Sequence, residues 1–429
     1  MTPIYHVWQP GRIGSLELDH RLIMGSMHLN LEARDDQGAS LAAFYAERAH
    51  AGASLIITGG IAVNTVGAGG RMYAVITEHP HQQALSRAVT AVHQGGARIA
   101  AQLFHAGRYG FESAFGLTPV APSAQYSGFS RCMPEAMSEK QIQQTLTDFA
   151  HAADIVSTLG FDAIEVMGSE GYLINQFLSP ITNQRDDGWG GDAQRRLRFP
   201  LELLRRIKET TGLPVIFRIS GNDLMPGSST SNEIADFAVA LARAGVDAIN
   251  VGVGWHEAKV PTVQALVPPG VWVPYARMIN NAVRTAGVDV PVIASNRINR
   301  VEHAEQILTD GRIAFVSMAR PFLADPQIVR KSRSGQADAV NICIACNECI
   351  DRSIGDTAVS CLVNPRAGRE LDFPHPATAQ TGQPAEPSER SLSAARGGTH
   401  KRRIAVVGGG PAGLVAALSL VPRQATFGR

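Results

Sequence analysis

The chain has 429 residues, of which 45% are hydrophobic and 18% charged, values typical of a globular protein with a large core. Its formal net charge of +1 gives no electrostatic basis for binding nucleic acid or an anionic membrane surface. No apolar run approaches the length of about eighteen residues that a membrane-spanning helix requires. We therefore expect a small molecule or another protein as the partner.

Short runs rich in β-branched residues alternate along the chain with longer helical patterns. Eight such alternations favour a (β/α)8 TIM barrel that closes near residue 336, with a doubly wound open sheet as the alternative. In a barrel of this kind the functional groups gather at the carboxyl ends of the strands. The expected strands are residues 21–27, 54–60, 98–105, 163–168, 214–220, 248–254, 291–297 and 313–319, and the expected helices include residues 41–51, 81–94, 148–159, 195–211, 231–244 and 300–309.

Several expected strands end in residues suited to a phosphorylated planar cofactor such as FMN. Gln102 offers both a donor and an acceptor to a pyrimidine-like edge, and the fixed charge of Arg218 suits an anionic reduced flavin. Arg297 and Arg320 follow the last two strands, where barrels commonly hold a phosphate. Taken singly, Gln102 or Arg218 is more often a structural polar residue at a barrel rim, and it is the agreement of these residues in strand position that favours a cofactor site. The predicted cofactor contacts are Ser26, Met27, His28, Gln102, Arg218, Arg297, Ala319 and Arg320.

Two residues with acid–base chemistry follow the fourth and sixth strands. Tyr172 is a neutral proton donor, and His256 can polarise a carbonyl or orient that donor. Strand ends around one rim place such groups close together. A tyrosine and a histidine with only structural hydrogen bonds are the alternative interpretation.

Four cysteines form a compact motif in which Cys343, Cys346 and Cys349 have CxxCxxC spacing and Cys361 follows. Each two-residue gap turns the chain so that successive thiolates point to one centre, which predicts a [4Fe-4S] cluster. A zinc site more often has two separated CxxC pairs, and zinc or unligated thiols remain as alternatives. Because no secretion signal precedes the first cysteine, we expect a cytosolic protein with reduced thiols, Cys132 among them.

Residues 403–414 read RIAVVGGGPAGL, a strand, a glycine turn and the start of a helix. This is a dinucleotide-binding fingerprint, in which glycines let the backbone approach a pyrophosphate. No acidic residue follows Glu389, so the carboxylate expected about twenty residues further on to bind the ribose is missing. The glycines that would contact FAD or NAD(P) are Gly408, Gly410 and Gly413.

These patterns together predict the domain organisation. A linker is expected between the cysteine motif and the fingerprint, because this stretch is rich in Pro, Ala, Ser, Gly and Gln. We expect the final segment to be the truncated start of a nucleotide-binding domain, without a working site of its own. The expected units are an FMN-binding barrel over 1–336, a cluster segment over 337–370, a linker over 371–400 and a Rossmann-like fragment over 401–429.

At these residues the chain resembles the Old Yellow Enzyme-like flavoproteins that carry an added iron-sulfur cluster. Among them it is most similar to the bacterial NADPH-dependent 2,4-dienoyl-CoA reductases of fatty acid β-oxidation. The resemblance runs from about residue 8 to residue 368 and again over 403–414. The segments that carry it are Met24–His28, Phe44–Arg48, Glu165–Asn175, the stretch 254–261, Ser317–Asp325 and Cys361–Arg366.

The resemblance implies an electron chain in which NADPH reduces FAD, electrons pass singly through [4Fe-4S], and FMN in the barrel delivers hydride to substrate. It assigns proton donation to Tyr172, a partner role at the substrate to His256 and a tuning role to Glu170. Hydride addition to a conjugated acyl-CoA or enone leaves an extended enolate, which an acid must protonate. With its FAD and NADPH part truncated, the chain is expected to take electrons from a separate protein.

The chain also departs from its relatives. Old Yellow Enzymes proper carry a His and an Asn or His that hold an enone oxygen, whereas Met167 and Glu170 stand here, which favours the dienoyl-CoA branch. Those reductases have an arginine at the position of Ile181 and one more residue in the cysteine motif, whose spacing here matches amine-oxidising relatives. An amine dehydrogenase is therefore one alternative, although only Trp255 is evident as part of an aromatic cage. A non-catalytic electron-transfer remnant is another.

Overall fold

The structure is a computed structural model of the chain and describes residues 4–375. The predictions at Gly408, Gly410 and Gly413, and those for most of the linker, lie outside the described residues.

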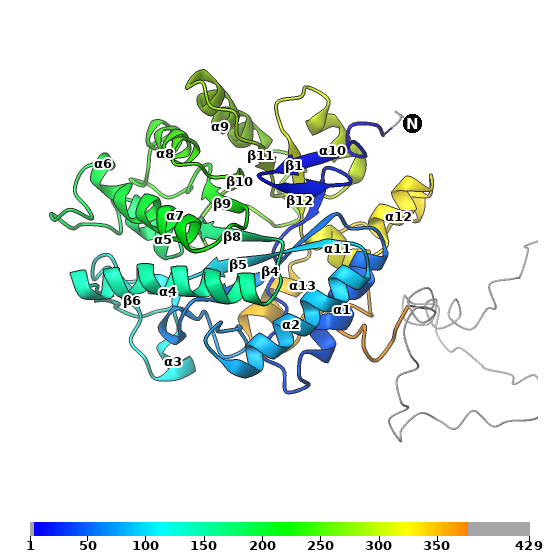
Figure 1. Ribbon diagram of the computed structural model, residues 1–429, viewed down its shortest axis with the longest axis horizontal. Helices are drawn as coiled ribbons and strands as arrows, with labels where there is room; N and C mark the ends of the chain where they lie inside the picture. Colours follow the sequence, from blue (N-terminus) through cyan, green and yellow to red (C-terminus); the bar gives the residue numbers. More distant parts are fainter. Residues whose placement is uncertain (1–3, 376–429) are drawn as a thin grey trace, which may run out of the picture. The chain divides into compact units, whose positions relative to one another are not determined.

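Eight parallel strands form a closed barrel in which each strand pairs with the next along the chain. The ring closes where the last strand returns to the first, with Val316 opposite Leu22 (Figure 1). This closure confirms the (β/α)8 barrel and excludes the open sheet. The barrel strands are β3 (Leu22–Met24), β4 (Leu55–Ala62), β5 (Arg98–Phe104), β8 (Ala163–Gly168), β9 (Val215–Ser220), β10 (Ala248–Gly252), β11 (Val292–Ala294) and β12 (Phe315–Met318).

Amphipathic helices surround the barrel in Figure 1 and bury one face against it. In α7 the buried residues Phe199, Leu203 and Ile207 recur at helical spacing, whereas Arg205 on the other face is exposed. The helices of six residues or more are α1 (Ala39–His50), α2 (His79–Gln94), α4 (Glu139–Thr158), α5 (Leu173–Leu178), α7 (Arg198–Thr210), α8 (Ser231–Arg243), α9 (Val273–Thr285), α10 (Val301–Leu308), α12 (Ile328–Arg333) and α13 (Glu348–Ile354).

Short elements complete the connections between these strands and helices. They are the helical turns η1 (Thr65–Gly67), η2 (Gly107–Tyr109), α3 (Glu112–Phe115), α6 (Ala193–Arg196), α11 (Arg320–Ala324) and η3 (Ala337–Ala339), and the short strands β1 (Gly11–Ile13), β2 (Leu16–Leu18), β6 (Val120–Ala121) and β7 (Glu135–Ala136).

The observed helices differ from the expected ones in two places. Helix α4 begins nine residues earlier than expected, because Ser138 and Gln141 form a capping box that satisfies the first amides. Helix α9 was not among the expected elements and follows the long loop after β10. The expected strand over 291–297 is shorter because Asn296 and Arg297 have φ angles of 67° and 56°, which end the extended backbone.

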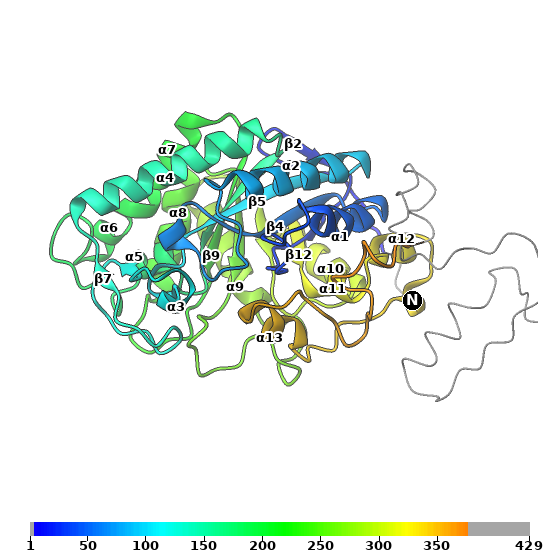
Figure 2. The ribbon, with the colours of Figure 1, turned by 90° about the horizontal axis from the view of Figure 1, so that it is seen from below.

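A hairpin formed by β1 and β2 closes the amino-terminal end of the barrel. Its apolar residues Ile13, Leu16 and Leu18 belong to the same buried cluster as the inward-facing Ile216 and Phe315. In Figure 2, β2 lies at one end of the barrel and α13 lies at the other. The sealed end leaves the carboxyl ends of the strands as the accessible end.

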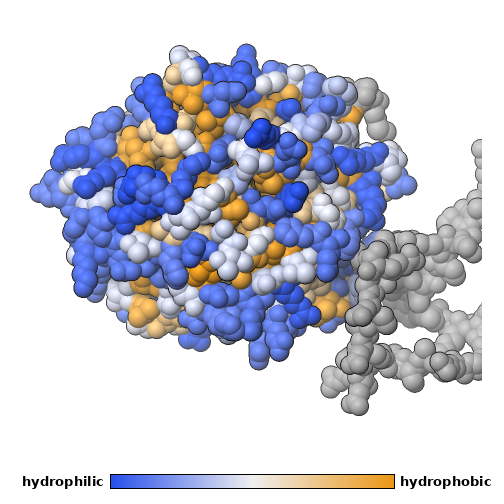
Figure 3. Space-filling view, viewed as in Figure 1, coloured by the Kyte–Doolittle hydropathy of each residue, from blue (hydrophilic) through white to orange (hydrophobic). Residues whose placement is uncertain are grey.

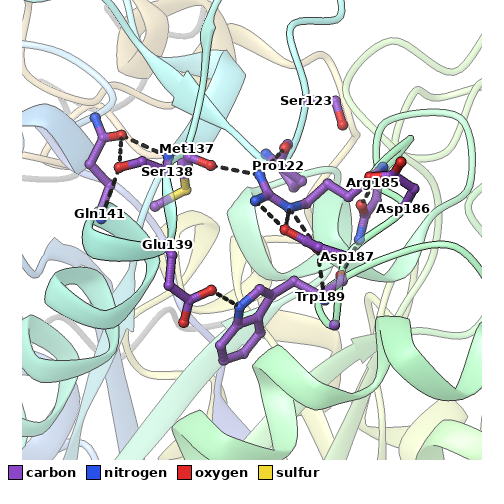
Figure 4. Close-up of polar contacts among 12 residues, drawn as sticks. Pro122, Ser123, Met137, Ser138, Glu139, Gln141, Arg185, Asp186, Asp187 and Trp189 are labelled. Carbon is purple, nitrogen blue, oxygen red and sulfur yellow. Dashed lines mark hydrogen bonds and ion pairs between the residues drawn. The ribbon is translucent and has the colours of Figure 1, made fainter.

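The loop between α5 and α6 is fastened by Arg185, as Figure 4 shows. Its guanidinium donates to the backbone oxygens of Pro122 and Met137 and forms an ion pair with Asp187. The indole of Trp189 donates to Glu139 at the start of α4. These contacts join the connection between β5 and α4 to the loop that follows β8 and α5.

Ion pairs connect helix α1 to the segment that follows the cysteines. Glu47 accepts two hydrogen bonds of 2.8 Å from Arg366, and Arg48 donates to Glu370 at 2.8 Å. Arg48 and Glu370 are buried, with side-chain exposures of 0% and 2%. Two sequence segments that carry the family resemblance, 44–48 and 361–366, therefore meet in space.

Hydrophilic residues cover much of the face drawn in Figure 3. Among residues 4–375, no helix is both long and apolar enough to cross a membrane.

Removal of the Glu370 carboxylate tests the ion pair with Arg48. In Glu370→Ala the buried guanidinium loses its counter-charge, so we expect the free energy of unfolding to fall by about 3–5 kcal/mol. Urea unfolding followed by circular dichroism measures this loss. Glu209→Ala is the control, because Glu209 forms an exposed pair with Arg205 and its loss should leave the midpoint nearly unchanged. Equal midpoints for both variants would contradict the interpretation.

Candidate active site

A cavity of about 590 Å³ lies at the carboxyl ends of the barrel strands. The barrel residues predicted from the sequence all line it, and so do two of the four motif cysteines, Cys343 and Cys349. The predicted residues brought together there are Ser26, Met27, His28, Gln102, Glu170, Tyr172, Arg218, His256, Arg297, Ala319 and Arg320.

A polar network crosses the floor of the cavity. Ser26 donates to the side-chain oxygen of Gln102 at 2.9 Å, and the amide nitrogen of Gln102 donates to Glu165 at 2.7 Å. Asn250 also donates to Glu165 at 2.7 Å, and Glu165 is fully buried. The network holds the Gln102 amide in one orientation and leaves one N–H and one oxygen lone pair available to a ligand.

His28 has unused hydrogen-bonding capacity beside this floor. Both of its ring nitrogens are buried without a hydrogen-bond partner among residues 4–375. Its ring stacks on Tyr73 with centroids 3.5 Å apart, and burial lowers the pKa of His28 despite the nearby carboxylate of Glu32. Buried polar groups are rarely left unpaired, so this neutral imidazole suits a ligand that hydrogen-bonds to it.

Positive charge gathers at the ends of β11 and β12. Burial and the neighbouring charge of Arg320 lower the pKa of Arg297. Within the described part of the chain, neither arginine forms an ion pair, and each donates to a backbone oxygen, Arg297 to Val267 and Arg320 to Val263. Two guanidinium groups without a carboxylate suit a phosphate.

Glu170 and Arg218 form an ion pair at the wall of the cavity. The guanidinium donates to Glu170 Oε1 at 2.7 Å, and the hydroxyl of Ser169 donates to the same carboxylate. Burial opposes the charge of Arg218, but Glu170 and the more distant Glu165 raise the pKa of the guanidinium above its ordinary value. Glu170 has a φ angle of 55°, a left-handed conformation that is unusual for a non-glycine residue and typical of functional sites.

Tyr172 and His256 are directly hydrogen-bonded in the cavity. The phenolic oxygen lies 3.0 Å from Nε2 of His256. Burial raises the pKa of Tyr172 well above its ordinary value, so the phenol keeps its proton. His256 is exposed to the recessed cavity, and the loss of bulk water lowers its pKa although Glu170 and Glu257 act in the opposite direction. The pair is therefore a neutral donor oriented by a neutral imidazole.

Sequence reasoning missed the aromatic lining of the cavity. Only Trp255 was evident as a cage residue, whereas several further aromatic side chains surround the Tyr172–His256 pair. Apart from Phe104, which ends β5, they come from loops and a short turn without a periodic pattern, so the sequence pattern does not identify them. The additional aromatic lining residues are Tyr73, Phe104, Tyr109, Phe111 and Phe129.

The cysteine motif lies beside the cavity, but its thiols are not in ligand geometry. Among residues 4–375, no group of three or more His, Cys, Asp or Glu lies close enough to hold a metal ion. Burial raises the pKa of Cys349 to about 11; Arg320 opposes this rise, and Cys343, Cys361 and Cys346 add to it. The four thiols are therefore near enough to influence one another electrostatically.

Comparison with known proteins agrees with a flavin site in a TIM barrel. Residues 6–339 match the model of the NADH:flavin oxidoreductase / NADH oxidase family. A metal reductase from Desulforamulus reducens is 41% identical over 88% of this chain and 56% of its own length. An NADH oxidase from Thermoanaerobacter brockii is 35% identical over 99% of this chain and 62% of its own length. A 2-naphthoyl-CoA reductase structure superposes with a TM-score of 0.80 at 29% identity, covering 86% of this chain and 58% of that one.

The fold and site define a flavin-dependent oxidoreductase built on a TIM barrel. The chain belongs to the NADH:flavin oxidoreductase / NADH oxidase family, whose members include Old Yellow Enzyme-like proteins. This membership supports FMN as the cofactor, and the ring nitrogens of His28, the Gln102 amide and the two arginines fit such a group. The chain spans 56–62% of the length of the curated relatives named above.

The turn that carries Arg108 and Tyr109 begins at a buried histidine, His105. Its Nδ1 accepts a 3.0 Å hydrogen bond from the backbone amide of Gly107, so the neutral ring is required there. Burial lowers the pKa of His105 to about 3.

Acidification should therefore destabilise the protein through His105. As the pH falls below about 6.5, His105 takes up a proton in the unfolded chain, whereas in the folded chain it does so only near pH 3. This difference lowers the free energy of unfolding by about 2 kcal/mol at pH 5. In His105→Asn the amide oxygen can still accept from Gly107, and this loss disappears. Urea unfolding at pH 7.5 and pH 5 measures the difference, with His20 present in both proteins. If the free energy of unfolding fell equally between pH 7.5 and pH 5 in the wild type and the variant, the prediction would be contradicted.

Proposed function

We propose that this chain is an FMN- and [4Fe-4S]-dependent reductase of a C=C bond conjugated to the carbonyl of an acyl-CoA, such as a 2,4-dienoyl-CoA. The observation that carries this proposal is the Tyr172–His256 hydrogen bond inside a cavity suited to FMN. The similarity to a 2-naphthoyl-CoA reductase supports a thioester substrate over a simple enone. Met167 and Glu170 in place of the residues that hold an enone oxygen support the same choice.

FMN, when bound, supplies a hydride equivalent to the far carbon of the conjugated system. Tyr172 then delivers its proton to the resulting enolate, so that two electrons and two hydrogens are added across the substrate. A raised pKa keeps Tyr172 protonated at neutral pH, and an enolate is a stronger base than a phenolate. His256 orients the phenol and, with its proton on Nε2, stabilises the phenolate as the proton leaves.

The predicted cofactor contacts divide the cavity between recognition of a ring and of a phosphate. All of these residues line the cavity; in this proposal Ser26, Met27, His28 and Gln102 would contact the flavin ring, and Arg297 and Arg320 would neutralise its phosphate. Ala319 precedes Arg320 at the beginning of α11. Glu170 forms an ion pair with Arg218. We therefore assign it the role of stabilising the charge of that guanidinium and not that of contacting the substrate.

A [4Fe-4S] cluster held by Cys343, Cys346, Cys349 and Cys361 would supply one-electron transfer beside the FMN site. Four cysteine thiolates are the chemical donor set that such a cluster takes, although the thiols do not stand in ligand geometry in this structure. The residues on either side of Cys346, Ala345 and Asn347, have φ angles of 54° and 65°, turns that redirect the chain between successive cysteines. In this proposal the electrons would come from NADPH through FAD, or from a separate protein.

A second candidate is oxidation of an amine, with electrons leaving the barrel. The aromatic lining favours it, because a cationic amine is attracted to the faces of such rings. The neutral proton donor Tyr172 and the similarity to a 2-naphthoyl-CoA reductase make the reductase the better-supported proposal.

The substrate assignment is tested by Tyr172→Phe. After anaerobic reduction with dithionite, a 2,4-dienoyl-CoA should rapidly reoxidise the flavin of the wild type, followed by absorbance. Loss of the phenolic proton should slow this step about 10²–10⁴-fold without loss of flavin. Tyr5→Phe is the control, because Tyr5 is 61% exposed and does not line the cavity. A wild-type flavin that stays reduced would reject the dienoyl-CoA proposal, and bleaching of the oxidised flavin by an amine would favour the second candidate.

The cluster is tested by replacing one motif cysteine and the isolated one. Protein purified without oxygen should contain about four iron atoms per chain, because a single cubane is expected. Cys361→Ser should lower the iron content and the visible absorbance of the cluster, whereas Cys132→Ser should leave both unchanged. Iron and sulfide analysis with electron paramagnetic resonance measures this. Zinc in place of iron, or an equal effect of both substitutions, would overturn the cluster.

A further inference from the structure

The carboxylate of Glu257 joins three segments at the rim of the cavity. Its Oε1 accepts from the backbone amides of Gly128 at 2.7 Å and Phe129 at 3.3 Å. Its Oε2 accepts from the hydroxyl of Tyr109 at 2.9 Å and from the guanidinium of Arg108. The donors belong to the turn after β5 and to the loop 126–131, while Glu257 itself follows β10.

Arg108 strengthens the same junction. Its other nitrogen donates to the backbone oxygen of Tyr126 at 2.7 Å, and its own backbone oxygen accepts from Ser130 at 2.6 Å. The side chains of Arg108 and Glu257 are 6% and 14% exposed, so water screens their attraction only weakly. A partly buried charge pair therefore holds loop 126–131, in addition to the packing of Phe129 against the apolar cluster that includes Tyr109 and Trp255.

This junction determines where the aromatic residues lie around His256. The ring of Phe129 stacks on His256, with centroids 5.1 Å apart and planes 21° apart. The ring of Tyr109 lies 5.1 Å from Phe129 and 6.0 Å from Tyr172. His256 is thus held between a hydrogen bond to Tyr172 and the face of Phe129.

Glu257 is not suited to proton transfer, because its acceptor sites are filled. An ionised carboxylate offers about four acceptor sites. Four donors occupy them, two on each oxygen. A substrate proton would have to displace one of these donors and break the junction.

We propose that Glu257 is a positioning residue that holds loop 126–131, and through Phe129 fixes His256 in its hydrogen bond with Tyr172. Its contribution to the reaction rests on the proposed function of that pair. Its hold on the loop does not, so the two parts have separate readouts.

Hydrogen–deuterium exchange of the holoenzyme tests the hold on the loop. In Glu257→Ala the amides of Gly128 and Phe129 lose their acceptor, and peptides covering 126–131 should exchange about tenfold faster or more. Glu257→Gln, which keeps the side-chain size, should give a smaller increase in the same peptides. Glu233→Gln is the matched control, since Glu233 likewise accepts from a backbone amide, that of Thr230, and pairs with an arginine remote from the rim. Unchanged exchange in both Glu257 variants would overturn the proposal.

Reoxidation of the reduced flavin by substrate tests the link to Tyr172. Glu257→Gln should slow this step about tenfold at saturating substrate, with flavin content unchanged. If Glu257 acts through the Tyr172–His256 pair, the same substitution should have little further effect in a Tyr172→Phe background. A full tenfold loss in that background would overturn the positioning role. If the wild type itself is not reoxidised, the proposed function fails, whereas the exchange experiment still decides whether Glu257 holds the loop.

Discussion

Loss of bulk water at the carboxyl end of the barrel is the constraint on which the candidate site depends. Burial keeps the proton on Tyr172 and lowers the pKa of His28, and the loss of bulk water in the recessed cavity lowers the pKa of His256, so these acid–base groups are neutral at physiological pH. Arg218 keeps its charge in the same surroundings because Glu170 pairs with it. The hairpin that seals the other end of the barrel leaves this end to form the cavity.

Much of the fold was predictable from the sequence, because a parallel barrel repeats one local pattern eight times and orders its strands as the chain does. The same regularity explains why residues as distant as Gln102 and Arg320 could be assigned to one rim. The lining residue Phe129 and the rim residue Glu257 could not be found, because the loops that carry them have no period. Their positions depend on long-range polar contacts, such as the one between Arg108 and Glu257.

For the cysteine segment, the sequence predicts the ligands of a cluster but not the position of the segment beside the barrel. Its spacing predicts a cluster, while the ion pairs of Glu47 with Arg366 and Arg48 with Glu370 explain how the segment reaches the barrel. These pairs join residues more than 300 positions apart, so no local pattern in the sequence reveals them. They bring the motif to the cavity, which Cys343 and Cys349 line.

Charge is distributed unevenly along the cavity, and this distribution bears on what it binds. At one wall Glu170 offsets the charge of Arg218 through a hydrogen bond of 2.7 Å. At the ends of β11 and β12, Arg297 and Arg320 have no carboxylate partner among residues 4–375. A dianionic phosphate gains the most electrostatic energy beside Arg297 and Arg320. A ring whose charge changes during the reaction suits the wall formed by Arg218 and Glu170, where the two charges offset each other. Electrostatics therefore favours the ends of β11 and β12, rather than the wall at Arg218, as the place for a phosphate.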